Sequence, residues 1–154
     1  MIGSLQRNKV RRTIELARLI HSVESMKLAE AIHEEGIRRD RVVEVLVQVN
    51  IAGEATKHGM NPRAVLAVIE QMMTMAGLEV RGLMCIAPLD ASPERTRPVF
   101  ERCAELFGEI RRVGVAGPRF DLLSMGMSND FEVAIECGAN LVRVGTAIFG
   151  APAE

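Results

Sequence analysis

The chain has 154 residues, enough for one domain with its own hydrophobic core, and its 48% hydrophobic and 25% charged residues are typical of a globular protein. A formal net charge of -1 and a pI of about 6.3 disfavour binding to nucleic acid or to an anionic membrane surface. No apolar run approaches the roughly 20 residues of a membrane span, and no signal-peptide pattern opens the sequence, so we expect a cytoplasmic protein without membrane partners.

Short strand-like runs alternate with helical segments along the chain. The strands are predicted, in chain order, at Leu19–Val23, Val42–Asn50, Glu79–Met84, Asp121–Gly126 and Leu141–Gly145. The helices are predicted at Met26–Glu35, Asn61–Met75 and Pro93–Val113. Asn61 and Ser92 each precede a proline, which is typical of an N-cap followed by proline at the first helical position. The alternation predicts an α/β fold with a parallel sheet covered by helices, either open or curled into a barrel.

The faces of the predicted strands favour the barrel. Side chains alternate along a strand, so Val42–Asn50 has one face of valines and one mixed face that includes Glu44 and Gln48. The valine face suits packing against helices, and the mixed face suits a barrel interior. Small and polar residues share faces near the last two strand ends, namely Ser124, Gly126 and Ser128, then Arg143 and Gly145. A barrel places its binding site at these ends, although an open sheet would place a ligand there too.

The segments GMSND and RVGTAIFG, which follow these two strands, suggest a phosphate site. Strand-end glycines and hydroxyls before a helix start can hold a phosphate, because backbone N–H groups point at the anion and the helix dipole favours it. The candidate residues are Gly126, Ser128, Arg143, Gly145 and Thr146. Spacing alone leaves a second interpretation open, in which the glycines form turns, Asn129 or Asp130 caps a helix, and Arg143 pairs with a carboxylate.

Four blocks of the sequence can be compared with the motifs of known protein families. They are IGSLQRNK at Ile2–Lys9, VNIAGEATKHG at Val49–Gly59, RGLMCIAP at Arg81–Pro88, and SMGMSNDFEVAIECGANLVRVGTAIFG at Ser124–Gly150. In content and order these blocks resemble the pyridoxal phosphate homeostasis protein family, whose barrels are similar to the N-terminal domain of bacterial alanine racemase. The resemblance covers essentially the whole chain. It implies a (β/α)8 TIM-barrel-like fold, here an incomplete barrel of about six βα units in a single truncated domain, residues 1–154.

The resemblance also implies which residues bind the cofactor, pyridoxal 5′-phosphate. The phosphate would be held by Ser128, Gly145 and Thr146, with Ser124 and Gly126 nearby. Arg143 would face the pyridine nitrogen, where a cation disfavours protonation of the ring and makes the cofactor a poorer electron sink. Asn50 and Met84 would line the ring pocket. A strand-end cap and a core methionine are the alternative interpretations of these two residues.

The family's cofactor lysine lies upstream of the Ile2–Lys9 block, where this sequence has no residues. The three lysines present are Lys9 and Lys57, in loop motifs, and Lys27, in a predicted helix, and none matches that position. We therefore expect a truncated barrel that binds pyridoxal phosphate noncovalently at best. Its unpaired strand edges favour self-association into a homo-oligomer.

Three classes of function can be weighed against these observations. The first, which we predict, is a noncatalytic carrier or buffer of the cofactor in pyridoxal phosphate homeostasis, with this small molecule as its partner. The second is an amino-acid racemase, which needs the cofactor lysine and a tyrosine base, and the chain contains no tyrosine. The third is a degenerate barrel fragment that self-associates without a cofactor.

The cysteines and histidines show no metal-site pattern. Cys85, Cys103 and Cys137 are far apart and lack ligand spacing, so we expect reduced core thiols and a cytoplasmic location. His21, His33 and His58 are also widely separated, which favours structural roles over metal binding. We predict no metal site.

Overall fold

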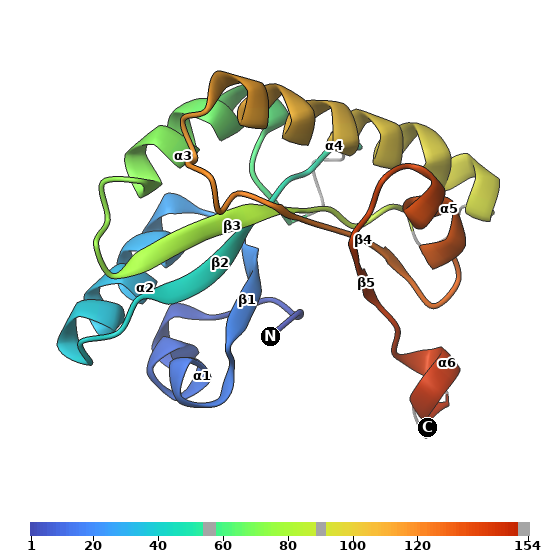
Figure 1. Ribbon diagram of the computed structural model, residues 1–154. Coiled ribbons are helices and arrows are strands. Elements are labelled where there is room, and N and C mark those ends of the chain that lie inside the picture. The colour runs from blue at the N-terminus through green and yellow to red at the C-terminus, as the bar shows by residue number, and fades with distance from the viewer. Residues whose placement is uncertain (54–57, 89–91, 151–154) are drawn as a thin grey trace.

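The computed structural model describes residues 1–53, 58–88 and 92–150 of the chain. Its strands form one parallel sheet in the order β1-β2-β3-β4-β5. They are β1 (Leu19–Val23), β2 (Val43–Gln48), β3 (Leu78–Met84), β4 (Leu122–Met127) and β5 (Leu141–Arg143). The sheet curves into an arch, a half-barrel whose strands run in one direction (Figure 1). The predicted α/β barrel-like class is therefore confirmed.

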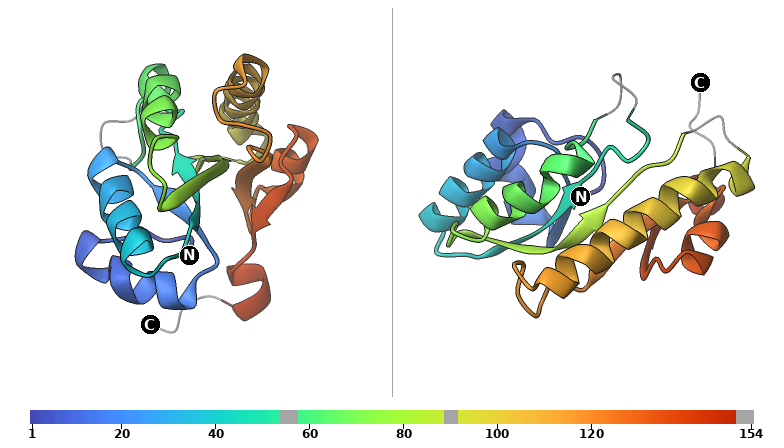
Figure 2. Two further views of the ribbon diagram at one scale, coloured as in Figure 1. Left: turned by 60° about the vertical axis from the view of Figure 1, so that its left-hand side comes forward. Right: turned by 90° about the horizontal axis from the view of Figure 1, so that it is seen from above.

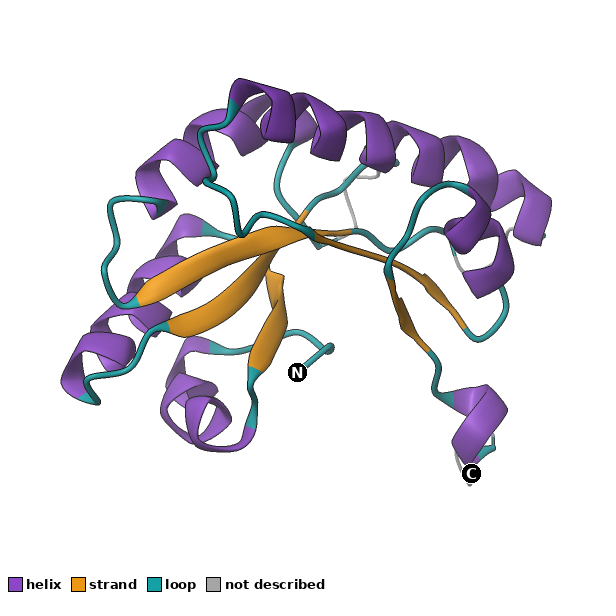
Figure 3. Cartoon of the chain, in the orientation of Figure 1, coloured by secondary structure: helices purple, strands orange, loops and turns teal. Residues whose placement is uncertain are grey.

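Helices follow the strands and cover the convex side of the arch (Figure 3). They are α1 (Val10–Leu16), α2 (Met26–Arg38), α3 (Val65–Met72), α4 (Pro93–Val113), α5 (Phe131–Glu136) and α6 (Thr146–Phe149), with short 3-10 helices η1 (Arg7–Lys9) and η2 (Pro62–Ala64). Helices α3 and α4 lie next to one another over the sheet, while α1 and α6 lie at the two ends of the arch (Figure 2). None of the helices in the described ranges has both the length and the apolarity that crossing a membrane requires.

The hydrophobic core fills the space between the sheet and these helices. The valines of β2, Val43, Val45 and Val47, are fully buried in it, as the alternation of side chains predicts. Leu46 and Met84 are fully buried too, but they do not belong to this cluster, because their side chains point to the concave face. Both faces of the sheet are therefore packed, and the concave face also carries polar groups.

Local signals placed most element ends correctly. Helix α4 has the predicted bounds, and Asn61 caps η2 by accepting a hydrogen bond from the Arg63 N–H at 2.9 Å. Ser92 occupies the N-cap position of α4 and Pro93 opens the helix, as predicted, although the Ser92 side chain makes no capping bond. The predicted helix Asn61–Met75 instead divides into η2 and α3 and ends earlier.

The structure describes five strands, whereas the sequence predicts about six βα units. The segment before β1 pairs with it through a single residue. The Met1 amine donates a hydrogen bond to the Leu19 carbonyl oxygen at 2.8 Å, and the Met1 carbonyl oxygen accepts one from the His21 N–H at 2.9 Å. This is the pattern of a single parallel bridge. One bridging residue is too short to count as a strand.

Candidate functional site

Three polar side chains meet on the concave side of the sheet. His21 comes from β1, Ser124 from β4 and Arg143 from β5, and their exposed fractions are only 8%, 0% and 4%. The Arg143 Nη1 donates to the Ser124 Oγ at 2.6 Å, and its Nη2 donates to the Cys85 carbonyl oxygen at 2.8 Å. The His21 Nδ1 lies 3.0 Å from the same Ser124 Oγ. The fold thus places a hydrogen-bonded chain of three buried side chains inside the arch.

The charge of Arg143 is unusual because it is buried without a carboxylate partner. No Asp or Glu of the described ranges forms an ion pair with it, so the interpretation of Arg143 as one half of an ion pair is wrong for this part of the chain. Burial lowers the pKa of Arg143, with smaller opposing effects from Cys85 and Asp130. An arginine remains protonated in proteins, so the interior carries a positive charge that forms no ion pair within the described residues.

His21 is neutral at pH 7. Burial lowers its pKa to about 4, and the positive charges of the N-terminal amine and Arg143 act in the same direction. Sequence reasoning gave this histidine only a structural role. The available signal was weak: a histidine next to a serine in a short strand otherwise made of Leu, Ile and Val.

Ser128, Gly145 and Thr146 come together at the start of α6, as predicted. The Ser128 Oγ accepts hydrogen bonds from the Gly145 N–H at 3.1 Å and the Ala147 N–H at 3.3 Å. The N–H of Thr146, which lies between them, meets no acceptor among the described residues. Sequence analysis missed Ala147 because it contributes only its backbone. This arrangement suits an anion, since the Thr146 N–H and the Ser128 hydroxyl are available to donate.

The prediction that Gly126 shares a face with Ser124 and Ser128 is wrong. Gly126 has a φ of +87°, and the pairing of β4 with β5 shifts register between Ser124 and Met127. A Cβ at this position would lie 2.7 Å from both the Ala134 Cβ and the Phe131 Cα. The bulge therefore turns Gly126 toward α5, where a residue without a side chain allows close packing.

Asn50 and Met84 have different surroundings in the structure. Met84 pairs in register with both Gln48 and Ser124, so it lies in the interior beside the polar chain. Asn50 instead closes the turn after β2 by accepting the Gly53 N–H at 3.1 Å, as its strand-end interpretation proposed. It also lines an outer pocket of about 530 Å³ together with Arg63 and Arg102.

Comparison with known proteins places the chain in a family. The description "Alanine racemase, N-terminal domain" matches residues 1–153. The chain belongs to the alanine racemase N-terminal domain family. Among its relatives are proteins named pyridoxal phosphate homeostasis protein, from Aquifex aeolicus (strain VF5), 43% identical over 150 residues, and from Haemophilus influenzae, 37% identical over 151 residues. Each match covers 97% of this chain but only 64% and 63% of these relatives, so the chain spans less than two thirds of their length.

Solved structures in the same family have the same fold. PipY of Synechococcus elongatus PCC7942 matches with TM-scores of 0.88 without PLP and 0.86 with PLP bound, at 34% identity. Both matches cover 96% of this chain and 68% of PipY. Alanine racemase of Clostridium difficile 630 matches with a TM-score of 0.71 at 14% identity, which shows a shared fold only. The predicted family is confirmed.

The two lysines that the structure describes lie away from the hydrogen-bonded side chains of His21, Ser124 and Arg143. Lys9 is exposed on η1 and Lys27 is exposed on α2. Lys57 lies outside the described residues, as does the middle of the Val49–Gly59 block. Neither described lysine reaches the interior where Arg143 is buried.

The remaining candidates have structural partners. The His33 Nδ1 accepts the Gly77 N–H at 3.0 Å, and the His58 Nδ1 lies 3.0 Å from a carboxylate oxygen of Glu24. In the described ranges, no three side chains of the metal-binding types gather at one place. The cysteines are free thiols, as predicted; Cys85 and Cys103 are buried in the core, and Cys137 is partly exposed and packs against it.

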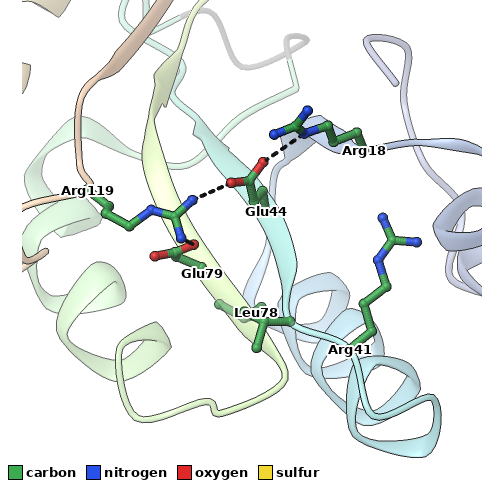
Figure 4. A pocket seen from close by; sticks show the side chains of 7 residues that line it. Arg18, Arg41, Glu44, Leu78, Glu79 and Arg119 are labelled. Carbon is green, nitrogen blue, oxygen red and sulfur yellow. Dashed lines mark hydrogen bonds and ion pairs between the residues drawn. The ribbon is translucent and has the colours of Figure 1, made fainter.

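A second pocket, of about 520 Å³, lies at the opposite, amino-terminal edge of the sheet (Figure 4). Its central group is Glu44, which accepts hydrogen bonds from Arg81 and from Arg119 at 2.6 Å, while the Arg18 Nε lies 3.8 Å away. Arg119 also pairs with Glu79 at 2.8 Å. The carboxylates here already have cationic partners, so this edge is a stabilising ion-pair network rather than a ligand site.

Proposed function

We propose that this chain binds pyridoxal 5′-phosphate noncovalently on the concave side of the half-barrel and serves in cytoplasmic homeostasis of that cofactor. The observation that carries the proposal is the placement of Arg143, which has no ion-pair partner among the described residues, next to the anion-binding groups. Arg143 is the register partner of Met127, directly before Ser128, and it lies three residues before Thr146. The names of the relatives, the PLP-bound PipY structure and the free thiols support the proposal.

The residues present fit the cofactor. The Thr146 N–H and the Ser128 hydroxyl, whose oxygen accepts two N–H groups and whose proton is free to donate, bind the phosphate. Arg143, held by Ser124 and the Cys85 carbonyl, would lie beside the ring nitrogen of a bound cofactor and would disfavour its protonation. When bound, the cofactor supplies an electrophilic aldehyde and an electron-withdrawing ring. Because Arg143 would weaken that electron withdrawal, a cofactor bound here would stabilise a carbanion less well than one with a protonated ring nitrogen.

Titration with pyridoxal phosphate tests the proposal. We expect a saturable change in cofactor absorbance, competition by inorganic phosphate, and no added mass after borohydride reduction. Ser128→Ala should weaken binding about three- to tenfold, because it removes one donor to the phosphate. Ser92→Ala is the matched control, since the exposed Ser92 makes no capping bond, and it should bind like the unchanged chain.

Two results would overturn parts of the proposal. A reducible adduct on one specific lysine would contradict noncovalent binding. Equal binding by the Ser128→Ala and Ser92→Ala variants would contradict the placement of the phosphate.

A second candidate function is self-association, supported by exposed apolar residues at both ends of the arch. Ile148 and Phe149 of α6 are 68% and 86% exposed beyond β5, and Leu16 at the end of α1 is 78% exposed near β1. A two-fold axis parallel to the strands would place β5 of each copy beside β1 of the other with all strands parallel. Sedimentation velocity of the unchanged chain and of Phe149→Ser tests this function. A monomer at every concentration would contradict it.

A further inference from the structure

His21 is the one member of the buried polar chain that the proposed function does not use. Its imidazole reaches Ser124 across the concave side of the sheet, from a residue 103 positions away in the sequence. Ser124, in turn, is completely buried and lies between His21 and Arg143. A polar chain that is this deeply buried has to satisfy its hydrogen-bonding groups internally.

The direction of each hydrogen bond follows from the chemistry of the donors. A guanidinium has only donors, so Ser124 must accept the 2.6 Å bond from Arg143. The single hydroxyl proton of Ser124 then needs an acceptor, and the His21 Nδ1 lies within reach at 3.0 Å. His21 therefore accepts at Nδ1 and carries its own proton on Nε2.

The surroundings of His21 keep it in this acceptor state. The charged groups that face it are the N-terminal amine of Met1, which bonds along β1, and Arg143 from β5, and both are positive. A protonated imidazole would donate to Ser124 at Nδ1 and add a second buried cation. Ser124 would then accept from both neighbours, and its own proton would lack a partner.

We propose that His21 is a positioning residue for Arg143: it turns the Ser124 hydroxyl so that its oxygen faces the guanidinium, and it thereby fixes the cation where the ring nitrogen of pyridoxal phosphate binds. The inference rests on the proposed function and names a residue that acts on that site through Ser124. The Cys85 carbonyl holds the other end of the guanidinium at 2.8 Å. Loss of His21 therefore leaves the Ser124 hydroxyl, one of the two anchors, free to rotate, and Arg143 becomes loose rather than displaced.

The first test uses the chain without any cofactor, by nitrogen-15 NMR of the imidazole and guanidinium groups. We expect the Nε2–H tautomer of His21, and we expect Ser124→Ala to change the Nδ1 resonance. His21→Leu should broaden the Arg143 side-chain resonances through faster rotation, while His21→Asn, whose amide oxygen replaces the Nδ1 acceptor, should restore them. An Nδ1–H tautomer, or Arg143 resonances unchanged in a folded His21→Leu variant, would overturn the inference.

The second test measures pyridoxal phosphate binding and the pH at which the bound ring nitrogen becomes protonated, followed by absorbance. His21→Leu should weaken binding about five- to tenfold and raise that pH, and His21→Asn should reverse most of both changes. His33→Asn is the control, because His33 also accepts a hydrogen bond at Nδ1 but lies outside the site.

The two tests separate the two ideas. No cofactor binding by the unchanged chain, together with the expected NMR result, would refute the proposed function and leave His21 as the positioning residue of Arg143. Binding by folded His21→Leu that equals binding by the unchanged chain would refute the positioning role and leave the proposed function standing.

Discussion

At the amino ends of the strands, Glu44 accepts hydrogen bonds from two arginines, a third lies at ion-pair distance, and Glu79 binds one of them as well. At the carboxyl ends, Arg143 is more deeply buried than any of these, and its bonds go to a serine and a backbone carbonyl. The first region compensates its charges within the protein. In the second, the partners that hold the cation among the described residues are neutral groups.

This difference has an energetic meaning. A buried charge without a counter-ion costs stability, because desolvation is only partly repaid by hydrogen bonds to neutral groups. An ion-pair network near the surface has a small favourable effect and needs no ligand. A fold keeps the costly arrangement where function requires it, so the contrast points to the carboxyl ends as the binding region.

The largest expected effect is on the pH dependence of stability, and it belongs to the carboxyl-end region alone. Because the pKa of His21 falls to about 4 in the folded chain, the unfolded chain binds the proton first as pH drops below its ordinary value of 6.5. The free energy of unfolding should therefore fall between about pH 6.5 and pH 4, by up to about 3 kcal/mol, and this contribution should stay constant below pH 4.

Urea unfolding of the unchanged chain and of His21→Leu across this pH range measures the effect. The quantity to compare is the slope of the free energy of unfolding against pH. The variant should lose most of the dependence, whereas the matched His33→Leu variant should keep it. Parallel curves for the unchanged chain and His21→Leu would show that His21 is not buried in its neutral form.

The next effect is on binding. Replacing Arg143 by methionine should weaken pyridoxal phosphate binding about 10- to 100-fold, since a charged hydrogen-bonding group beside the ring is lost. The free energy of unfolding should change little, because relief of the buried charge offsets the two lost hydrogen bonds. Arg119→Met is the matched control at the other end of the sheet, and it should lower stability while leaving binding intact. Weaker binding by Arg119→Met, with binding by Arg143→Met unchanged and its stability lowered, would contradict the contrast between the two regions.

The sequence predicted the local features of both the fold and the site. Proline and N-cap signals placed α4, and the alternation of valines in β2 identified its core face, because these depend on neighbours in the sequence. Ser128, Gly145 and Thr146 were grouped for the same reason, since each follows a strand end in a short motif. These features follow from residues close together in the chain.

The features that were missed depend on distant contacts. The bond from His21 to Ser124 joins β1 to β4, and no periodicity predicts such a pair. The outward turn of Gly126 depends on how β4 pairs with β5, which a regular alternation of side chains does not anticipate. The Glu44 network likewise joins residues from two strands and two loops, and its pairing depends on contacts between residues far apart in the sequence.

The smallest expected effect tests the amino end directly. Glu44→Gln removes the carboxylate that Arg81 and Arg119 share, and its side chain is only 18% exposed, so solvent cannot fully replace it. We expect the free energy of unfolding to fall by about 1–2 kcal/mol, less at high salt, with unchanged cofactor binding. Glu105→Gln, which breaks an exposed pair with Arg102 on α4, is the control and should change stability by less than about 0.5 kcal/mol. If Glu44→Gln instead impaired cofactor binding with stability intact, the amino end would belong to the functional site, and unpaired charge would no longer distinguish the two regions.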